Sequence, residues 1–322
     1  MSEFFLELFS EEIPANLQQT ARNSLLNNFV NLLNNKNINF KNSSSYSVPN
    51  RLVILFNGLP NQILEKKDEI RGPNTKAPEK SVEGFLRSNN ITMEEIFKKN
   101  TDKGEFYFYH KPEKKFKTHT FLEENIPAVL NSIQWKKSMK WAEYELSWGR
   151  PLKSILAIFN NKNLDFKYHH IESSNFTFLD KEFESKKKIF KSFKNYSSYL
   201  KKTGLIIDHN ERKDFIKKKL LQHSKNKNLN LDINEKILQE VTDLVEQPKI
   251  LMCKFDKKFL QIPKEILTIT MQNHQKYFPT FDDNNAISNE FFVVANNDDK
   301  KGFIKEGNER VVEARLSDAE FF

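Results

Sequence analysis

Cysteine and glycine are both scarce in this sequence of 322 residues, and each shortage excludes a class of site. The single cysteine, Cys253, rules out an internal disulfide and a zinc site built from several cysteines. Only 8 glycines are present, and neither a GxGxxG nor a GxxxxGK[ST] string occurs. The sequence therefore does not bind nucleotides through either of those glycine-rich loops.

Long apolar runs and a basic leader are also missing. No stretch approaches the roughly 20 apolar residues that a membrane-spanning helix needs. The amino end, MSEFFLELFSEE, is acidic and has no small-residue cleavage site. We therefore expect neither membrane insertion nor secretion. Together with the lone cysteine, this predicts a cytoplasmic location.

The common patterns of metal binding and catalysis do not occur either. There is no HExxH string, and the adjacent His169 and His170 belong to no spaced set of Cys and His. The aspartate pairs at 282–283 and 298–299 lack the central glycine and terminal glutamate of an EF-hand. We expect no metal site, no bound cofactor and no catalytic residue in this chain.

Positive charge is in modest excess. The sequence has 51 Lys and Arg against 43 Asp and Glu, a net charge of +8, and 38% of its residues are hydrophobic. It can therefore bury a core, and its charge favours an anionic partner such as nucleic acid. The abundance of Lys, Asn, Ile and Phe is also what AT-rich coding DNA produces, so the charge alone does not decide between function and composition.

Two groups of side chains are candidates for RNA binding. The first is expected on about one helical turn and just beyond it, among the indole rings of Trp135, Trp141 and Trp148. Its members are Lys136, Lys137, Lys140 and Arg150. Phosphates attract such cations, and indole faces stack on bases. The alternative is that the tryptophans belong to the core and the lysines extend from it into solvent.

The second group is His274 and Lys276, within the polar string QNHQKYF (272–278). These side chains can contact a polar ligand. The end of a helix also favours His and Lys through its dipole, so a structural role stays open. In the last helix, Arg310 and Arg315 alternate with acidic residues, which is typical of an exposed face with ion pairs.

Hydrophobic periodicity predicts an α+β fold with mixed sheets, packed helices and at least two subdomains. The predicted strands are 4–9, 51–57, 105–110, 115–120, 154–159, 205–207, 249–255 and 291–295, with a hairpin at 105–120. The predicted helices are 17–32, 81–87, 93–99, 122–139, 211–223 (capped by Asn210), 234–244, 263–273 and 308–322. Loops or turns are expected at 34–50, 71–77 and 225–230. The lysine-rich, helix-like stretch 181–202 divides the chain into regions 1–200 and 201–322.

Several long strings resemble the beta subunit of bacterial glycyl-tRNA synthetase, the type built from separate alpha and beta chains. They are FLELFSEEIPA (5–15), VPNRL (48–52), RGP (71–73), KKSMKW (136–141), GRPL (149–152), EVTDLVEQP (240–248), FLQIPKEILTITMQNHQKYFP (259–279) and GNERVVEARLSDAEFF (307–322). The resemblance covers the chain end to end. Part of the family's beta chain is also similar to the substrate-side domains of the phenylalanyl-tRNA synthetase beta chain, which agrees with an α+β fold.

The resemblance implies a subunit of glycine–tRNA ligase that is inactive alone. It would bind tRNA(Gly) and join an alpha subunit, in a complex of two alpha and two beta chains. The alpha subunit would hold the aminoacylation site and use ATP with Mg²⁺. A structural scaffold without RNA contact is the alternative, and an independent hydrolase is poorly supported.

This sequence departs from the family pattern in two places. Residues 173–176 read Ser-Ser-Asn-Phe where the family commonly has Gly-His-Arg-Phe, so any contact made by that histidine or arginine is not expected here. The family's HD-type helical domain and its anticodon-binding domain, which follow the DAEFF string, are expected to be absent. We therefore expect the chain to correspond to the amino-terminal half of such a subunit.

Overall fold

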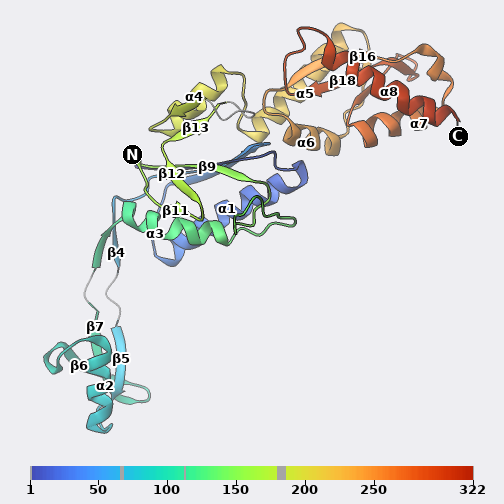
Figure 1. Cartoon of the computed structure of the whole chain (residues 1–322). Coiled ribbons are helices and arrows are strands. Elements are labelled where there is room, and N and C mark those ends of the chain that lie inside the picture. Colours follow the sequence, from blue (N-terminus) through green and yellow to red (C-terminus); the bar gives the residue numbers. More distant parts are fainter. Residues whose placement is uncertain (1, 66–68, 112–113, 180–185, 322) are drawn as a thin grey trace.

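The computed structural model describes residues 2–65, 69–111, 114–179 and 186–321. Within these ranges helices alternate with strands of several mixed sheets, which confirms the expected α+β class with more than one subdomain. Figure 1 shows a large sheet near the amino end, a smaller one near the carboxyl end and a third unit beyond the first. Within the described ranges, no helix combines the length and the apolar character needed to cross a membrane.

The large sheet has the strand order β11-β12-β9-β1-β3-β2, with β10 paired to β9. Its strands are β1 (Glu3–Ser10), β2 (Asn42–Val48), β3 (Arg51–Asn57), β9 (Leu152–Phe159), β10 (Lys162–Asn163), β11 (Lys167–Tyr168) and β12 (Ile171–Ser174). All its pairs are antiparallel except β12 with β9.

Helices cover both faces of this sheet. α1 (Ala15–Asn35) and α3 (Thr118–Asn131) pack on one face, where Phe4 and Leu6 of β1 belong to the same core as Leu25. α4 (Phe193–Lys202) packs on the other face, where the ring of Tyr196 lies 4.8 Å from that of Phe5. Alternate residues of β1 thus enter opposite cores, which explains why this strand is apolar on both sides.

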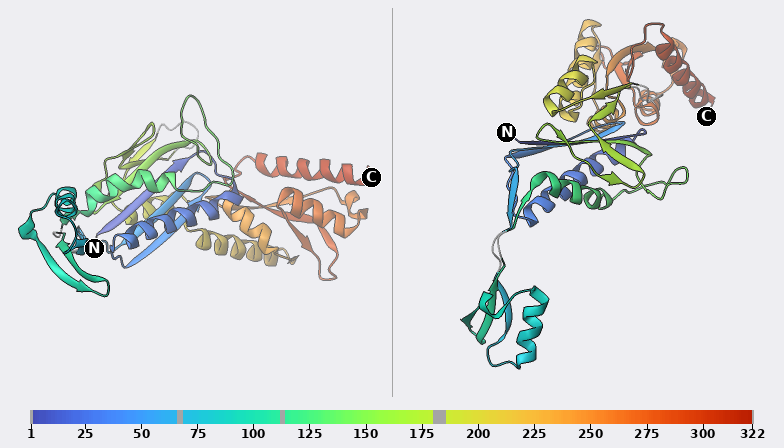
Figure 2. Two further views of the ribbon diagram at one scale, coloured as in Figure 1. Left: turned by 90° about the horizontal axis from the view of Figure 1, so that it is seen from below. Right: turned by 60° about the vertical axis from the view of Figure 1, so that its left-hand side comes forward.

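A small unit lies beyond the end of a narrow ribbon (Figures 1 and 2). The ribbon pairs β4 (Gln62–Glu65) with β8 (Lys114–Lys117). The unit consists of the three-stranded sheet β5-β7-β6 and one helix. Its elements are β5 (Glu69–Asn74), α2 (Glu79–Asn89), the 3₁₀ turn η1 (Met93–Glu95), β6 (Ile96–Thr101) and β7 (Gly104–His110).

The second large region holds an antiparallel sheet of order β15-β17-β18-β16. Its core on one side joins Ile216 and Leu238 to Phe278 and Phe292, and its core on the other side contains Val312 and Leu316. The elements are α5 (His209–Asn226), β15 (Asn230–Leu231), α6 (Glu235–Leu244), β16 (Lys249–Lys254), η2 (Lys257–Gln261), α7 (Lys264–Ile269), the π-helical turn η3 (Thr270–His274), β17 (Phe278–Phe281), β18 (Ile287–Ala295) and α8 (Phe303–Phe321).

Most elements predicted from periodicity are present, with ends that differ by a few residues. They are the strands expected at 4–9, 51–57, 105–110, 154–159, 249–255 and 291–295 and the helices expected at 17–32, 81–87, 211–223, 234–244 and 263–273. Residues 181–185 of the expected helix-like stretch lie outside the described residues. Next to that gap, β13 (Phe176–Phe178) pairs with β14 (Lys187–Ile189), and α4 follows. The division of the chain near residue 200 stays a prediction.

Strand pairing overrules several local predictions. Residues 93–99 form only the turn η1 before β6, which pairs with β7, so the helix predicted there is wrong. The predicted hairpin at 105–120 is also wrong, because β7 pairs with β5 and β6 while β8 pairs with β4. The loop expected at 34–50 contains β2, and the turn at 71–77 begins inside β5. Residues 205–207 are not a strand, although the Ile206 N–H donates to the Glu246 carbonyl.

The ends of several helices differ from prediction. Asp208, not Asn210, caps α5, since its carboxylate accepts from the Asn210 and Glu211 N–H groups at 2.8 and 3.2 Å. α5 also runs to Asn226, into the expected linker at 225–230. α8 begins at Phe303, ahead of the predicted start at 308. The helix predicted at 122–139 runs from Thr118 to Asn131.

Candidate functional site

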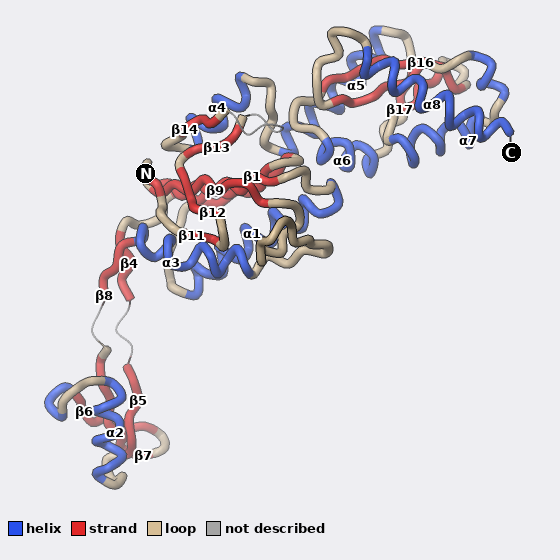
Figure 3. The backbone as a smooth tube through the Cα atoms, in the orientation of Figure 1, coloured by secondary structure: helices blue, strands red, loops and turns tan. Residues whose placement is uncertain are grey.

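A long loop, residues 132–151, connects α3 to β9 and carries the first group of predicted RNA-binding residues (Figure 3). Two parts of the loop are joined by an antiparallel β-bridge between Met139 and Trp148. The Met139 N–H donates to the Trp148 carbonyl at 2.8 Å, and the Trp148 N–H donates back at 3.1 Å. The two segments joined by this bridge therefore have a defined register, although neither belongs to a sheet.

The base of this loop is packed tightly around Gly149. An ideal Cβ at Gly149 would lie 2.3 Å from the Trp135 ring, far inside van der Waals contact, so only glycine fits without displacement. The Trp135 ring lies 5.2 Å from that of buried Trp148, which in turn meets Tyr168 edge-on at 5.9 Å. These aromatic contacts fix the loop against the large sheet, which fits the core alternative for Trp135 and Trp148.

The predicted cations of this loop lie at its surface, but not on a helix as expected. The chain leaves α3 at Asn131, and Lys136 and Lys137 follow in a bend with exposed side chains. Lys140 is exposed too, and its Nζ lies 2.7 Å from Glu145 Oε2. Arg150 is half-buried and donates to the Gly149 carbonyl at 2.7 Å. Lys136 and Lys137 are thus exposed to solvent, while Lys140 forms an ion pair with Glu145.

An exposed aromatic stack lies in the same loop. The Tyr144 side chain is 42% exposed, and its ring stacks on His170 with centroids 3.5 Å apart and planes 4° from parallel. Trp141 meets the His170 ring edge-on at 5.9 Å and the Tyr144 ring at 6.4 Å. Desolvation and the neighbouring His169 lower the pKa of His170 below its ordinary 6.5, so the imidazole is mainly neutral at pH 7.

The second predicted group lies in the other large region. His274 is exposed at the end of the π-helical turn η3. Lys276 is half-buried in the left-handed conformation, with a φ of 58°. Its Nζ lies 3.1 Å from Glu240 Oε2 on α6. Lys276 therefore bridges the start of β17 to α6, and only His274 of this group faces solvent without a described ion pair.

Motif residues near the amino end form a buried polar network that sequence reasoning did not identify. Glu7 of β1 is 0% exposed and lies 3.2 Å from the Arg51 guanidinium. Thr177 and Tyr196 also donate hydroxyl hydrogen bonds to the Glu7 carboxylate. Arg51 donates in addition to Thr177 Oγ1 and to the Phe178 carbonyl, both at 2.7 Å. Burial, and next to it the Glu7 charge, raises the pKa of Tyr196 well above 10, so its hydroxyl stays a donor.

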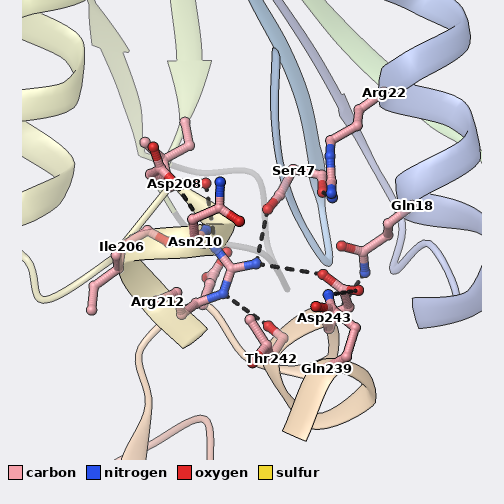
Figure 4. Close-up of polar contacts among 12 residues, drawn as sticks. Gln18, Arg22, Ser47, Ile206, Asp208, Asn210, Arg212, Gln239, Thr242 and Asp243 are labelled. Atoms are coloured by element: carbon pink, nitrogen blue, oxygen red, sulfur yellow. Dashed lines mark hydrogen bonds and ion pairs between the residues drawn. The ribbon is translucent and has the colours of Figure 1, made fainter. Parts of the chain in front are cut away.

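Arg212 of α5 forms a second buried junction, drawn in Figure 4. Its guanidinium is 0% exposed and donates to the carbonyls of Thr242, Ile206 and Ser47 at 2.8, 2.6 and 3.0 Å. It lies 3.8 Å from Asp243 Oδ1. Because Ser47 belongs to β2 and Thr242 to α6, one side chain ties the second region to the first sheet.

Gln18 and Arg22 of α1 complete this junction. Gln18 donates to the carbonyls of Asp243 and Ile13 at 2.6 and 3.0 Å, and Arg22 donates to Ser47 Oγ at 2.8 Å. The signal that could have found the first junction is the presence of Glu7 and Arg51 in otherwise apolar strings, whereas Arg212 lies in the charged string HNERKDFIKKK (209–219) and gives no such signal. A buried charge needs a partner, but sequence alone does not say which one.

At the edge of the large sheet, the first serine of the sequence departure at 173–176 has a structural role. The Ser173 hydroxyl donates to the Leu164 carbonyl at 2.6 Å and accepts from the Phe166 N–H at 2.9 Å. Among the residues that the structure describes, no group of three or more His, Cys, Asp or Glu side chains is arranged to hold a metal ion. The loop 132–151 itself offers exposed cations and an exposed aromatic ring, which suit electrostatic attraction and stacking.

The comparisons with known proteins give one consistent family. The profile of the family described as "Glycyl-tRNA synthetase beta subunit" matches residues 4–322. The glycine–tRNA ligase beta subunit of Rickettsia bellii is 35% identical over 323 residues, which is 100% of this chain and 49% of that protein. The corresponding subunits of Rickettsia felis and Rickettsia prowazekii are 34% and 35% identical, over 49% and 48% of their length.

The chain thus spans about half the length of these curated relatives. The strings that carried the resemblance lie in β1, at the start of β3, in the loop 132–151, in α6 and in α8, so the likeness extends through both large regions. The chain belongs to the glycyl-tRNA synthetase beta subunit family.

Proposed function

We propose that this chain is the tRNA-handling part of a glycine–tRNA ligase beta subunit. Within the ligase it binds tRNA(Gly) and joins an alpha subunit, in an assembly of two alpha and two beta chains in the cytoplasm. The alpha subunit supplies the aminoacylation site and uses ATP with Mg²⁺. The chain contributes binding surface and position, and has no ligase activity alone.

The observation that supports RNA binding most directly is the exposure of Lys136 and Lys137 in the same loop as the exposed ring of Tyr144. Cations that track the backbone and rings that stack on bases are the two components of single-stranded nucleic acid binding. His274 and Arg150 are secondary candidates. Lys140 and Lys276 contribute less, because each is already close to a carboxylate.

The test uses the assembled ligase, made from this chain, the carboxy-terminal half found in relatives and a matching alpha subunit. Binding of labelled tRNA(Gly) is measured by fluorescence anisotropy over a range of salt concentrations. Each lost phosphate contact flattens the plot of log K against log salt by about 0.7–0.9. We expect Lys136→Ala with Lys137→Ala to flatten this slope by more than 1.

The matched control is the adjacent pair Lys257→Ala with Lys258→Ala, which is also exposed but lies in the other large region. If both pairs change binding equally, attraction is spread over the whole basic surface and the loop has no special role. An unchanged slope in both variants supports the scaffold alternative. Glycine attachment by this chain without the alpha subunit would contradict the assignment of catalysis to the partner.

A further inference from the structure

We propose that Tyr144, supported by His170, is a stacking platform for an unpaired base of the bound RNA. This inference rests on the proposed function and names the part of the RNA that the loop recognises: single-stranded nucleotides rather than duplex. The outer face of the Tyr144 ring is available, since the side chain is 42% exposed while the His170 ring covers its other face.

The ring is held in place before any ligand arrives. Its centroid lies 3.5 Å from that of His170, nearly parallel, and Trp141 meets both rings at an angle. His170 lies in the turn between β11 and β12, directly before β12, so the support comes from the large sheet rather than from the loop itself. A ring that is already ordered loses little conformational entropy when a base stacks on it, which favours binding.

The surrounding charge favours a nucleic acid over a protein partner. Lys136, Lys137 and Lys140 lie in the same loop as Tyr144, and ammonium groups attract the phosphates of a nucleic acid. Glu145 is one of two opposing charges in the loop, and it is paired with Lys140 at 2.7 Å. The loop thus combines an exposed ring with nearby cations, although Glu143 reduces the local excess.

Only an unpaired base can use this platform. In a duplex the faces of the bases are stacked on one another, whereas single-stranded loops and ends expose them. Because every base has a π-face, such stacking tolerates any sequence and contributes about 1–3 kcal/mol per base. We therefore expect the loop to distinguish single-stranded from double-stranded RNA, but not one base from another.

The experiment compares two labelled RNAs of matched length, one an unstructured single strand and one a blunt-ended duplex, bound to the assembled ligase and measured by anisotropy. Tyr144→Ala should weaken binding of the unstructured RNA about tenfold and leave binding of the duplex unchanged. Tyr144→Phe keeps the ring and should bind like the parent. His170→Ala should weaken the unstructured RNA as well, while His170→Phe restores a supporting ring and the affinity.

The outcomes separate this inference from the proposed function. If Tyr144→Ala leaves both RNAs unchanged while Lys136→Ala with Lys137→Ala weakens tRNA, the platform is wrong and RNA binding by the loop stands. If neither variant affects RNA, both proposals fail. If Tyr144→Ala instead reduces co-purification with the alpha subunit and spares RNA binding, the exposed ring is a protein contact and the platform is overturned.

Discussion

The buried junctions and the exposed loop use similar residues in opposite ways. Glu7 and Arg51 lie in buried strands with exposures of 0% and 2%, and they pair with each other and with neighbouring hydroxyl groups. Lys136 and Lys137 lie in solvent at the surface of the loop 132–151. Both sets belong to strings that resemble the same family. A family string therefore marks a residue's importance without saying whether it folds the protein or meets a partner.

The buried junctions and the exposed loop differ in energy because their charges differ in solvation. Removing one member of a buried ion pair leaves the other charge without water or counter-charge, which costs about 3–5 kcal/mol. Exposed pairs are screened and contribute little. Variants at the junctions should therefore change stability, whereas variants in the loop should change binding while the fold is retained.

The largest effect is expected for Glu7→Ala. The change removes the counter-charge of Arg51 and the acceptor of the Thr177 and Tyr196 hydroxyl groups. We expect the free energy of unfolding, from urea denaturation followed by circular dichroism, to fall by about 3–5 kcal/mol. Glu145→Ala, which breaks only the exposed pair with Lys140, should leave the midpoint unchanged. Equal midpoints for both variants would remove the distinction between the regions.

Arg212→Met should have the next largest effect, because it keeps an apolar stem but removes the donors to four carbonyls, those of Thr242, Ile206, Ile207 and Ser47. A loss of about 2–4 kcal/mol is expected from the unsatisfied groups. Since this side chain ties α5 and α6 to β2, limited proteolysis should also cleave more rapidly between the two large regions. Arg315→Met, on the exposed side of α8, is the control and should behave like the parent. Unchanged proteolysis in Arg212→Met would show that other contacts suffice.

An element could be predicted from the sequence where the contacts that determine it are local. β1 and β3 were predicted correctly, because apolar runs with few competing signals form buried strands. The helix predicted to run from 122 to 139 ends at Asn131, because the chain turns away although Ile133 continues the apolar spacing of α3. What ends the pattern is the contact of Trp135 with Gly149, which local periodicity does not register. The exposure of Lys136 and Lys137 could be expected, but not the loop that presents them.

The buried junctions were beyond sequence reasoning for the same reason. Glu7 and Arg51 are far apart in the chain, and the antiparallel pairing of β1 with β3 brings them together. Asp208 and Asn210 can both cap a helix, so the choice between them depends on where the preceding segment leads. The stack of Tyr144 on His170 likewise joins a loop to the sheet edge. In each case the sequence shows the residue types, but it does not show which residues contact each other.

Gly149→Ala links the two kinds of region, because it lies at the base of the loop but packs like a core residue. The added methyl must displace the Trp135 ring, an overpacking that costs about 1–3 kcal/mol. The loop should shift with the ring, so affinity for unstructured RNA should fall as well. Gly307→Ala is the matched control: its Cβ meets nothing within 4 Å and it lies inside α8, where alanine is the better helix former. A destabilised Gly307→Ala alongside an unchanged Gly149→Ala would contradict this account.

The smallest effect is a loss of stability at acidic pH, caused by the protonation of one partly buried histidine. Burial, and next to it the charge of Arg22, lowers the pKa of His209 from 6.5 to about 4 in the folded chain. The unfolded chain therefore binds the proton more readily between those two values, so stability is greatest above pH 6.5 and falls as the pH drops toward 4. We expect His209 to contribute a loss on the order of 1–2 kcal/mol between pH 7.5 and pH 5.

His209→Gln tests this contribution, because glutamine has no proton to gain in that range. Urea midpoints measured at pH 7.5 and pH 5 should differ less in this variant than in the parent chain. His223→Gln, at an exposed position on the same helix, is the control for exchanging a histidine for a glutamine. If the difference between the two pH values is as large in His209→Gln as in the parent chain, His209 does not contribute to the acid loss.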